Sequence, residues 1–139
     1  MAYKVFISCT PEDVELARDL ARRLKEKTGV EVAPLSKAKE QDGLTATRVQ
    51  PALRKADEVL FLLTSGSEKS SRLWWELGLA SGLGKRITPI MVNLQPEKLP
   101  AAMQRQSIKY GDLPDYFSKL ALRAKRRKLG RRLPARAEQ

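Results

Sequence analysis

Residues 58–64 read Glu-Val-Leu-Phe-Leu-Leu-Thr, an almost continuous apolar run with no alternation of polar and apolar positions. A strand with one face in water alternates, so a run of this kind predicts a strand that is covered on both faces. Such strands belong to parallel sheets, because the helices that connect parallel strands lie on the two faces of the sheet. The run therefore restricts the chain to an α/β architecture.

The rest of the chain alternates strand and helix patterns, as this architecture requires. Runs rich in β-branched and aromatic residues predict strands at 3–8, 30–32, 58–64 and 87–92, with an edge strand at 107–110. The clearest helix follows a cap at Thr10 and ends at Gly29. Further helices are expected at about 45–55, after a cap at Ser71, and from Asp115 onward.

Five strands with helices between them predict a single doubly wound, flavodoxin-like domain: a five-stranded parallel sheet with helices on both faces. In the strand order 2-1-3-4-5 the winding reverses between the first and third strands. Ligands of such sheets bind outside the carboxyl ends of the strands at this reversal. The loops expected there are residues 8–13 and 64–71.

Composition excludes several kinds of chemistry. The chain has 139 residues, no histidine and a single cysteine, Cys9. A Ser-His-Asp triad, a Cys-His pair and a zinc site are therefore excluded, no metal is expected, and no disulfide can form within the chain. The start of the sequence lacks an apolar signal region, and no apolar run approaches the roughly 20 residues of a membrane span. We expect a cytoplasmic protein without a membrane partner.

The net charge of +11 is concentrated at the end of the chain. Residues 119–139 hold nine Lys and Arg against one acidic residue, whereas the preceding residues are nearly balanced. This basic segment either makes weak contacts with nucleic-acid phosphates or extends the last helix into water. The second interpretation is favoured because no aromatic residue follows Phe117 to stack on a base.

Glu76 is the charge that the helical pattern does not explain. It is the single charged residue between positions 73 and 84, and on a helical wheel it falls between Ala80 and Leu83, inside the apolar arc. A carboxylate is costly to bury unless a partner or a function compensates it. Its helix also follows the third strand, so it begins at the expected ligand-binding corner.

Several short motifs occur in a characteristic order. They are Val-Phe-Ile-Ser in the first strand, Glu12 and Asp13 at the first helix, Asp42-Gly43 after a long polar loop, Ala-Asp-Glu-Val at 56–59, Trp-Glu-Leu-Gly-Leu-Ala at 75–80, and Gly-Lys-Arg-Ile-Thr-Pro-Ile at 84–90. In this ordered set the chain resembles the bacterial form of the TIR (Toll/interleukin-receptor) domain over about residues 3–122. We therefore take residues 1–122 as the TIR domain and 123–139 as a basic helix end and tail.

The resemblance implies an activity. Many bacterial TIR domains cleave NAD+ at the bond between nicotinamide and ribose, and their catalytic glutamate lies in the helix after the third strand, where Glu76 is found. NAD+ would be a substrate, and no cofactor is implied. By the same resemblance, the residues expected to bind the substrate are Ser8, Cys9, Thr10, Leu35 and Ser65. Arg72 is added to them because of its position one helical turn before Glu76, where it could bind a phosphate. Cys9 is expected to line the pocket rather than to act as a nucleophile, since no histidine exists to activate it.

Arg72 departs from the family pattern, which usually has tryptophan four residues before the glutamate. One helical turn separates Arg72 from Glu76, so the guanidinium can either pair with the carboxylate or bind a phosphate. If it pairs, Glu76 is explained as a buried ion pair without catalysis.

Three functions remain open. The first is an NAD+ nucleosidase activated by self-association with other TIR domains, in bacterial defence or effector signalling. The second is a TIR module that binds other proteins without catalysis. The third is a nucleotide or nucleic-acid sensor that uses the basic tail.

Overall fold

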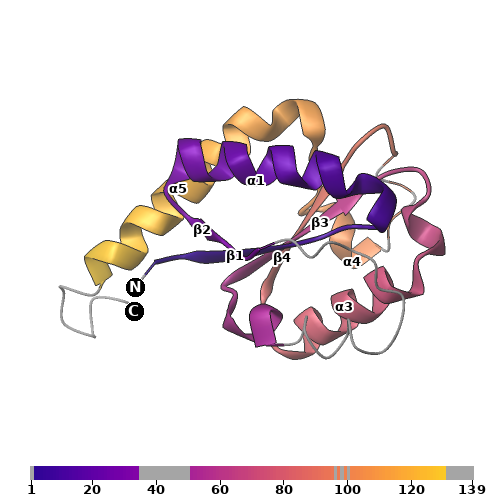
Figure 1. The fold of residues 1–139 in the computed structure, drawn as a ribbon, viewed down its shortest axis with the longest axis horizontal. Helices are drawn as coiled ribbons and strands as arrows, with labels where there is room; N and C mark the ends of the chain where they lie inside the picture. Colours follow the sequence, from indigo (N-terminus) through magenta and orange to yellow (C-terminus); the bar gives the residue numbers. More distant parts are fainter. Residues whose placement is uncertain (1, 35–50, 96, 98, 100, 131–139) are drawn as a thin grey trace.

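The computed structural model describes residues 2–34, 51–95, 97, 99 and 101–130, and these residues form a five-stranded parallel sheet with helices on both faces (Figure 1). The strand order is β2-β1-β3-β4-β5, which confirms the predicted doubly wound fold. The strands are β1 Lys4–Ser8, β2 Glu31–Val32, β3 Glu58–Leu63, β4 Arg86–Met91 and β5 Ile108–Lys109.

The helices lie close to their expected positions, apart from the short helix at Ala101–Gln104, which was not predicted. They are α1 Val14–Thr28, α3 Ser71–Gly82, α4 Ala101–Gln104 and α5 Leu113–Gly130, with short 3-10 turns at Pro11–Asp13, Ser67–Lys69 and Tyr110–Asp112. Residues 51–55 are also helical, in agreement with the expected second helix, whose first part lies outside the described residues. Gly29 ends α1 with a φ of 77°, in the left-handed conformation that glycine adopts without strain.

Two predicted caps differ in the structure. The Thr10 side chain forms no cap hydrogen bond, and a 3-10 turn separates it from α1. The cap of α3 is Ser70 rather than Ser71, because the Ser70 side chain accepts a hydrogen bond of 3.2 Å from the backbone N–H of Leu73. Ser70 and Ser71 are adjacent, and the pattern alone does not choose between them. Thr10 precedes the turn Pro11–Asp13, which the helical pattern did not separate from α1.

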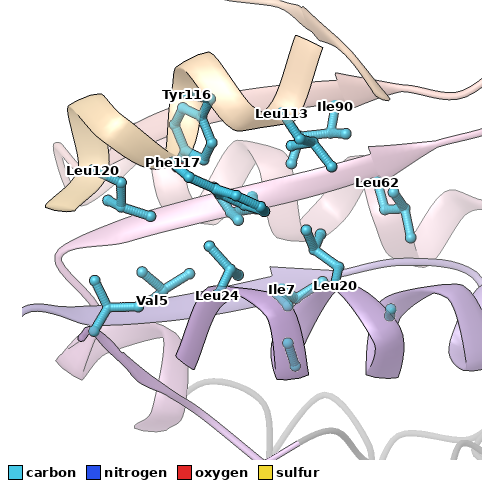
Figure 2. Packing of buried hydrophobic residues seen from close by; sticks show 14 of the residues in the cluster. Val5, Ile7, Leu20, Leu24, Leu62, Ile90, Leu113, Tyr116, Phe117 and Leu120 are labelled. Carbon is cyan, nitrogen blue, oxygen red and sulfur yellow. The ribbon is translucent and has the colours of Figure 1, made fainter. Parts of the chain in front are cut away.

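The central strand β3 is buried at every position, as its apolar run predicted. It pairs with β1 on one side and β4 on the other. Leu60 and Leu62 face the cluster formed with α1 and α5, whereas Phe61 and Leu63 face the cluster beneath α3 and α4. In Figure 2, apolar side chains of α1 and α5 meet those of the sheet in the first cluster. The two clusters form the core on either side of the sheet.

Glu58, at the amino end of β3, is fully buried between the sheet and α5. It accepts hydrogen bonds from the hydroxyls of Tyr3 (2.8 Å), Thr88 (2.7 Å) and Tyr116 (2.5 Å). The guanidinium of Arg123 donates to both carboxylate oxygens, at 3.0 and 3.2 Å. Because Tyr116 and Arg123 both belong to α5, this network fixes α5 against the amino end of the sheet.

The basic segment of the sequence is partly bound to the fold. Arg127 donates to Asp57 at 2.9 Å, and the second carboxylate oxygen of Asp57 accepts from the backbone N–H of Lys4 at 2.8 Å. Helix α5 therefore continues without a break past residue 122, and Arg123 and Arg127 serve as its anchors. Within the described part of the chain, no helix is long and apolar enough to cross a membrane.

We predict that Glu58→Gln lowers the free energy of unfolding by about 3 kcal/mol, as expected when one partner of a buried ion pair is lost. The glutamine amide would point its N–H donors at hydroxyl and guanidinium groups that now donate hydrogen bonds to Glu58. Urea denaturation measures the loss. Glu15→Gln is the matched control, because Glu15 pairs with Arg18 on the exposed surface of α1 and should leave stability unchanged. Equal stability of the two variants would contradict this account.

Candidate active site

Glu76 lies on α3 against the carboxyl end of β1. Its neighbours on the inward face of α3 are Leu73 and Ala80, and Glu76 itself is completely buried. One carboxylate oxygen accepts a hydrogen bond from the hydroxyl of Ser8, the last residue of β1, which is only 2% exposed. The fold thus joins two residues that are 68 positions apart in the sequence, at the corner where ligand binding was expected.

Arg72 holds the second oxygen of Glu76. Its Nη1 is 3.0 Å from Oε2 of Glu76, and its Nη2 donates to the backbone carbonyl of Cys9 at 2.7 Å. The Arg72 side chain is 29% exposed, whereas that of Glu76 is 1% exposed. The ion pair that the four-residue spacing allowed is therefore formed, and the guanidinium joins α3 to the end of β1.

Burial dominates the electrostatics of Glu76. The pKa of its carboxyl is raised above the ordinary value because burial disfavours the charged form, although the hydrogen bond from Ser8 and the charge of Arg72 act in the opposite direction. A buried carboxyl whose charged form is still disfavoured despite a neighbouring arginine contributes little to the stability of the fold. Perturbed carboxyl groups of this kind are concentrated at functional sites.

The environment of Cys9 disfavours the reactive thiolate form of its side chain. Burial and the negative charge of Asp13 raise the pKa of its thiol to about 11, against a smaller opposing effect of Arg72. The thiol is consequently protonated near neutral pH, and the thiolate is the reactive form. What Cys9 contributes is its backbone carbonyl, which accepts from Arg72.

Comparison with known proteins identifies the family. The family model described as TIR domain matches residues 5–127. The chain belongs to the TIR domain family. No curated protein matches its sequence significantly.

Solved structures have the same fold as this TIR domain. The TIR domain of the Toll-related receptor TRR-2 from Hydra magnipapillata has a TM-score of 0.64 and 19% identity, with 87% of this chain and 96% of that chain covered. Clostridium botulinum BcmB, a CMP N-glycosidase, has a TM-score of 0.55 and 22% identity, with 86% and 98% covered. The TIR domains of the activated Roq1 resistosome, which recognises the effector XopQ, have a TM-score of 0.55 and 17% identity, with 70% and 61% covered.

Asp13 was missed as part of this corner of the TIR domain. One of its carboxylate oxygens accepts from the hydroxyl of Thr10 at 2.9 Å and from that of Thr64 at 2.8 Å. It therefore connects the loops that follow β1 and β3. The loops 8–13 and 64–71 were both expected at this corner, but for Asp13 itself the sequence suggested only a favourable charge at a helix start, so Asp13 was not named as a site residue.

The remaining predicted residues have three outcomes. Thr10 is buried and donates to Asp13, and within the described residues no bond links this pair to Glu76. Ser65 is exposed in the loop after β3, and no bond connects it with Glu76 in the part of the chain that the structure describes. Leu35 lies outside the described residues. Across the described ranges, no group of three or more histidine, cysteine or acidic side chains could hold a metal ion.

We predict that Glu76→Gln raises the free energy of unfolding at pH 8, by up to about 1 kcal/mol, because a neutral amide avoids the cost of burying the charge. Since the pKa of Glu76 is raised in the folded protein, the folded state holds its proton more tightly than the unfolded state does. Wild-type stability therefore falls as the pH rises through the ordinary glutamate pKa toward the raised one.

The gain in Glu76→Gln should accordingly be absent near pH 4 and present at pH 8, in urea denaturation at both values. The comparison variant is Glu58→Gln, which alters the other fully buried carboxylate of the described residues. A loss of stability in Glu76→Gln as large as that in Glu58→Gln would identify Glu76 as a structural ion-pair residue.

Proposed function

We propose that this TIR domain is an NAD+ nucleosidase that cleaves the bond between nicotinamide and ribose, with Glu76 as the catalytic residue. The observation that supports this most directly is a fully buried carboxylate with a raised pKa at the carboxyl end of β1. Membership of the TIR family agrees with the proposal, because the position of Glu76 matches the catalytic glutamate of family members that cleave NAD+.

The reaction suits a carboxylate acting without histidine or metal. When the bond between ribose C1′ and the nicotinamide nitrogen breaks, its electron pair goes to the nitrogen, and nicotinamide leaves as a neutral molecule. The ribose becomes an oxocarbenium-like cation, which a nearby carboxylate stabilises strongly in a site shielded from water. Water then adds to C1′ and gives up a proton, so the products are nicotinamide, ADP-ribose and a proton. A carboxylate with a raised pKa is suited to accept that proton.

Ser8 and the loop after β1 would support Glu76. The hydroxyl of Ser8 holds one carboxylate oxygen, which fixes the orientation of the group that must face the ribose. We propose that Cys9, Thr10, Leu35 and Ser65 line the nucleotide site around it. Asp13 is a positioning residue in this scheme, since it holds Thr10 and the loop after β3 together.

One structural neighbour is consistent with the proposed class of reaction, and another is consistent with activation by assembly. BcmB is named as a CMP N-glycosidase, so the same fold elsewhere carries cleavage of a nucleotide N-glycosidic bond. The TIR domains of Roq1 belong to an assembled resistosome. We infer that the present domain is likewise activated by self-association with other TIR domains, in bacterial defence or effector signalling.

A non-catalytic TIR interaction module is the second candidate function. The contact that favours it is the closed ion pair, since the carboxylate of Glu76 is covered by Arg72 and is itself inaccessible. The third candidate, a nucleic-acid sensor, remains a prediction. Arg123 and Arg127 are engaged with Glu58 and Asp57, so a test by truncation should remove only residues after 130.

We predict that Glu76→Gln lowers the rate of nicotinamide release from NAD+ by roughly 10²-fold or more, the scale seen when a transition-state electrostatic contact is removed. The assay uses concentrated protein with a crowding agent, and chromatography measures nicotinamide. Because only the ionised carboxylate stabilises the ribose cation, wild-type activity should fall on the acid side, with an apparent pKa above the ordinary glutamate value.

The control variant is Glu26→Gln, which removes an exposed carboxylate of α1 and should leave nicotinamide release unchanged. Equal release from wild type and Glu76→Gln would contradict the catalytic role of Glu76. No release from either protein, at concentrations where the domain is assembled, would favour the interaction module.

A further inference from the structure

We propose that Arg72 makes the Glu76 site selective for substrates that carry a phosphate, by covering the carboxylate until a phosphate draws the guanidinium away. This inference rests on the proposed function, because it concerns which N-glycosides reach Glu76. It goes beyond that function by assigning substrate selection to one residue.

Arg72 is the accessible member of the group around Glu76. Ser8 and Glu76 are buried, and among the described residues that bond to Glu76, Arg72 alone has a partly exposed side chain. Its two terminal nitrogens are both in use, one on Glu76 and one on the carbonyl of Cys9. A ligand that approaches the carboxylate past these contacts must therefore displace the guanidinium.

The charges of the pair conflict with the reaction. While Arg72 is 3.0 Å from Glu76, its positive charge cancels the field that would stabilise a ribose cation, and it repels the cationic nicotinamide ring of NAD+. Catalysis by Glu76 consequently requires the pair to separate. Separation in a buried site is costly unless each charge receives a new partner.

NAD+ carries both of the required partners. Its nicotinamide riboside end is cationic and matches Glu76, and its diphosphate is anionic and matches Arg72. A guanidinium binds phosphate through two parallel hydrogen bonds, which makes phosphate a stronger partner than the backbone carbonyl that it would leave. The motion that we propose is a rotation of the Arg72 side chain, which is 29% exposed. A nucleoside without phosphate offers no partner for Arg72 and leaves Glu76 covered.

The test compares NAD+ with nicotinamide riboside, which has the same scissile bond and no phosphate. Wild type should cleave NAD+ with a kcat/KM at least about tenfold higher than that for nicotinamide riboside. In Arg72→Gln the ratio of the two kcat/KM values should fall by about tenfold or more, with a higher KM for NAD+ and faster cleavage of the riboside. Arg72→Lys keeps the charge without the planar guanidinium, so its ratio of kcat/KM values should lie between those of wild type and Arg72→Gln. Arg18→Gln, on the exposed surface of α1, is the matched control and should keep the wild-type ratio.

A second measurement does not depend on activity. Inorganic pyrophosphate is added to protein with labelled arginine side chains and glutamate carboxyl groups, and the NMR signals of Arg72 and Glu76 are assigned from Arg72→Gln and Glu76→Gln. Pyrophosphate alone offers Glu76 no cation, so the buried carboxylate takes up a proton when the guanidinium leaves. Millimolar pyrophosphate should therefore shift both signals in wild type, and it should leave the Glu76 signal of Arg72→Gln unchanged.

The two measurements separate the two proposals. If wild type cleaves neither substrate but pyrophosphate shifts both signals, the NAD+ nucleosidase function fails, and the exchange at Arg72 is supported. If NAD+ is cleaved and Arg72→Gln keeps the wild-type substrate ratio, the selective role of Arg72 is wrong, although the proposed function stands. Absence of any NMR response to pyrophosphate would overturn the exchange whatever the activity.

Discussion

A carboxylate buried in this domain must find its hydrogen-bond donors inside the fold, because water no longer solvates the charge. Among the described residues, Glu58 and Glu76 are the two acidic side chains that are fully buried. Glu58 accepts hydrogen bonds from three hydroxyl groups, those of Tyr3 beside β1, Thr88 on β4 and Tyr116 on α5. It also accepts from a guanidinium of α5. The placement of α5 follows from this requirement, since Tyr116 and Arg123 reach Glu58 only when α5 crosses the amino end of β3.

Glu76 is compensated in a different way at the other end of the strands. Within the described residues it has two partners, a buried hydroxyl and a partly exposed arginine from its own helix. An apolar side chain at this position would be at least as stabilising, because buried ion pairs seldom exceed well-packed apolar residues in stability. The charge at this edge, where doubly wound sheets bind ligands, is therefore consistent with the catalytic role that we propose for Glu76.

The fold could be predicted from the sequence, and Glu76 could be selected as a candidate site residue, because their signals are local. The apolar run at 58–64 required a covered strand, and the apolar face of α3 made Glu76 conspicuous. Arg72 was also accessible to sequence reasoning, since a four-residue spacing already brings two helical side chains together. Glu58 was not, because a glutamate at the start of a strand resembles an ordinary boundary residue. Its donors come from positions 55 and 58 residues away, and only the folded chain brings them together.

The two buried carboxylates also differ in how far a change at each would spread. Breaking the hydrogen bonds of Glu58 would release α5 from the sheet, because these bonds join separate elements of the fold. Moving Arg72 away from Glu76 breaks one bond within α3 and one to the backbone carbonyl of Cys9, and the bond from Ser8 to Glu76 can remain. The carboxyl edge of the sheet can therefore exchange partners while the amino edge stays fixed. A site that must remain closed in the isolated domain, and open when substrate or another TIR domain arrives, requires this division between a fixed edge and an exchangeable one.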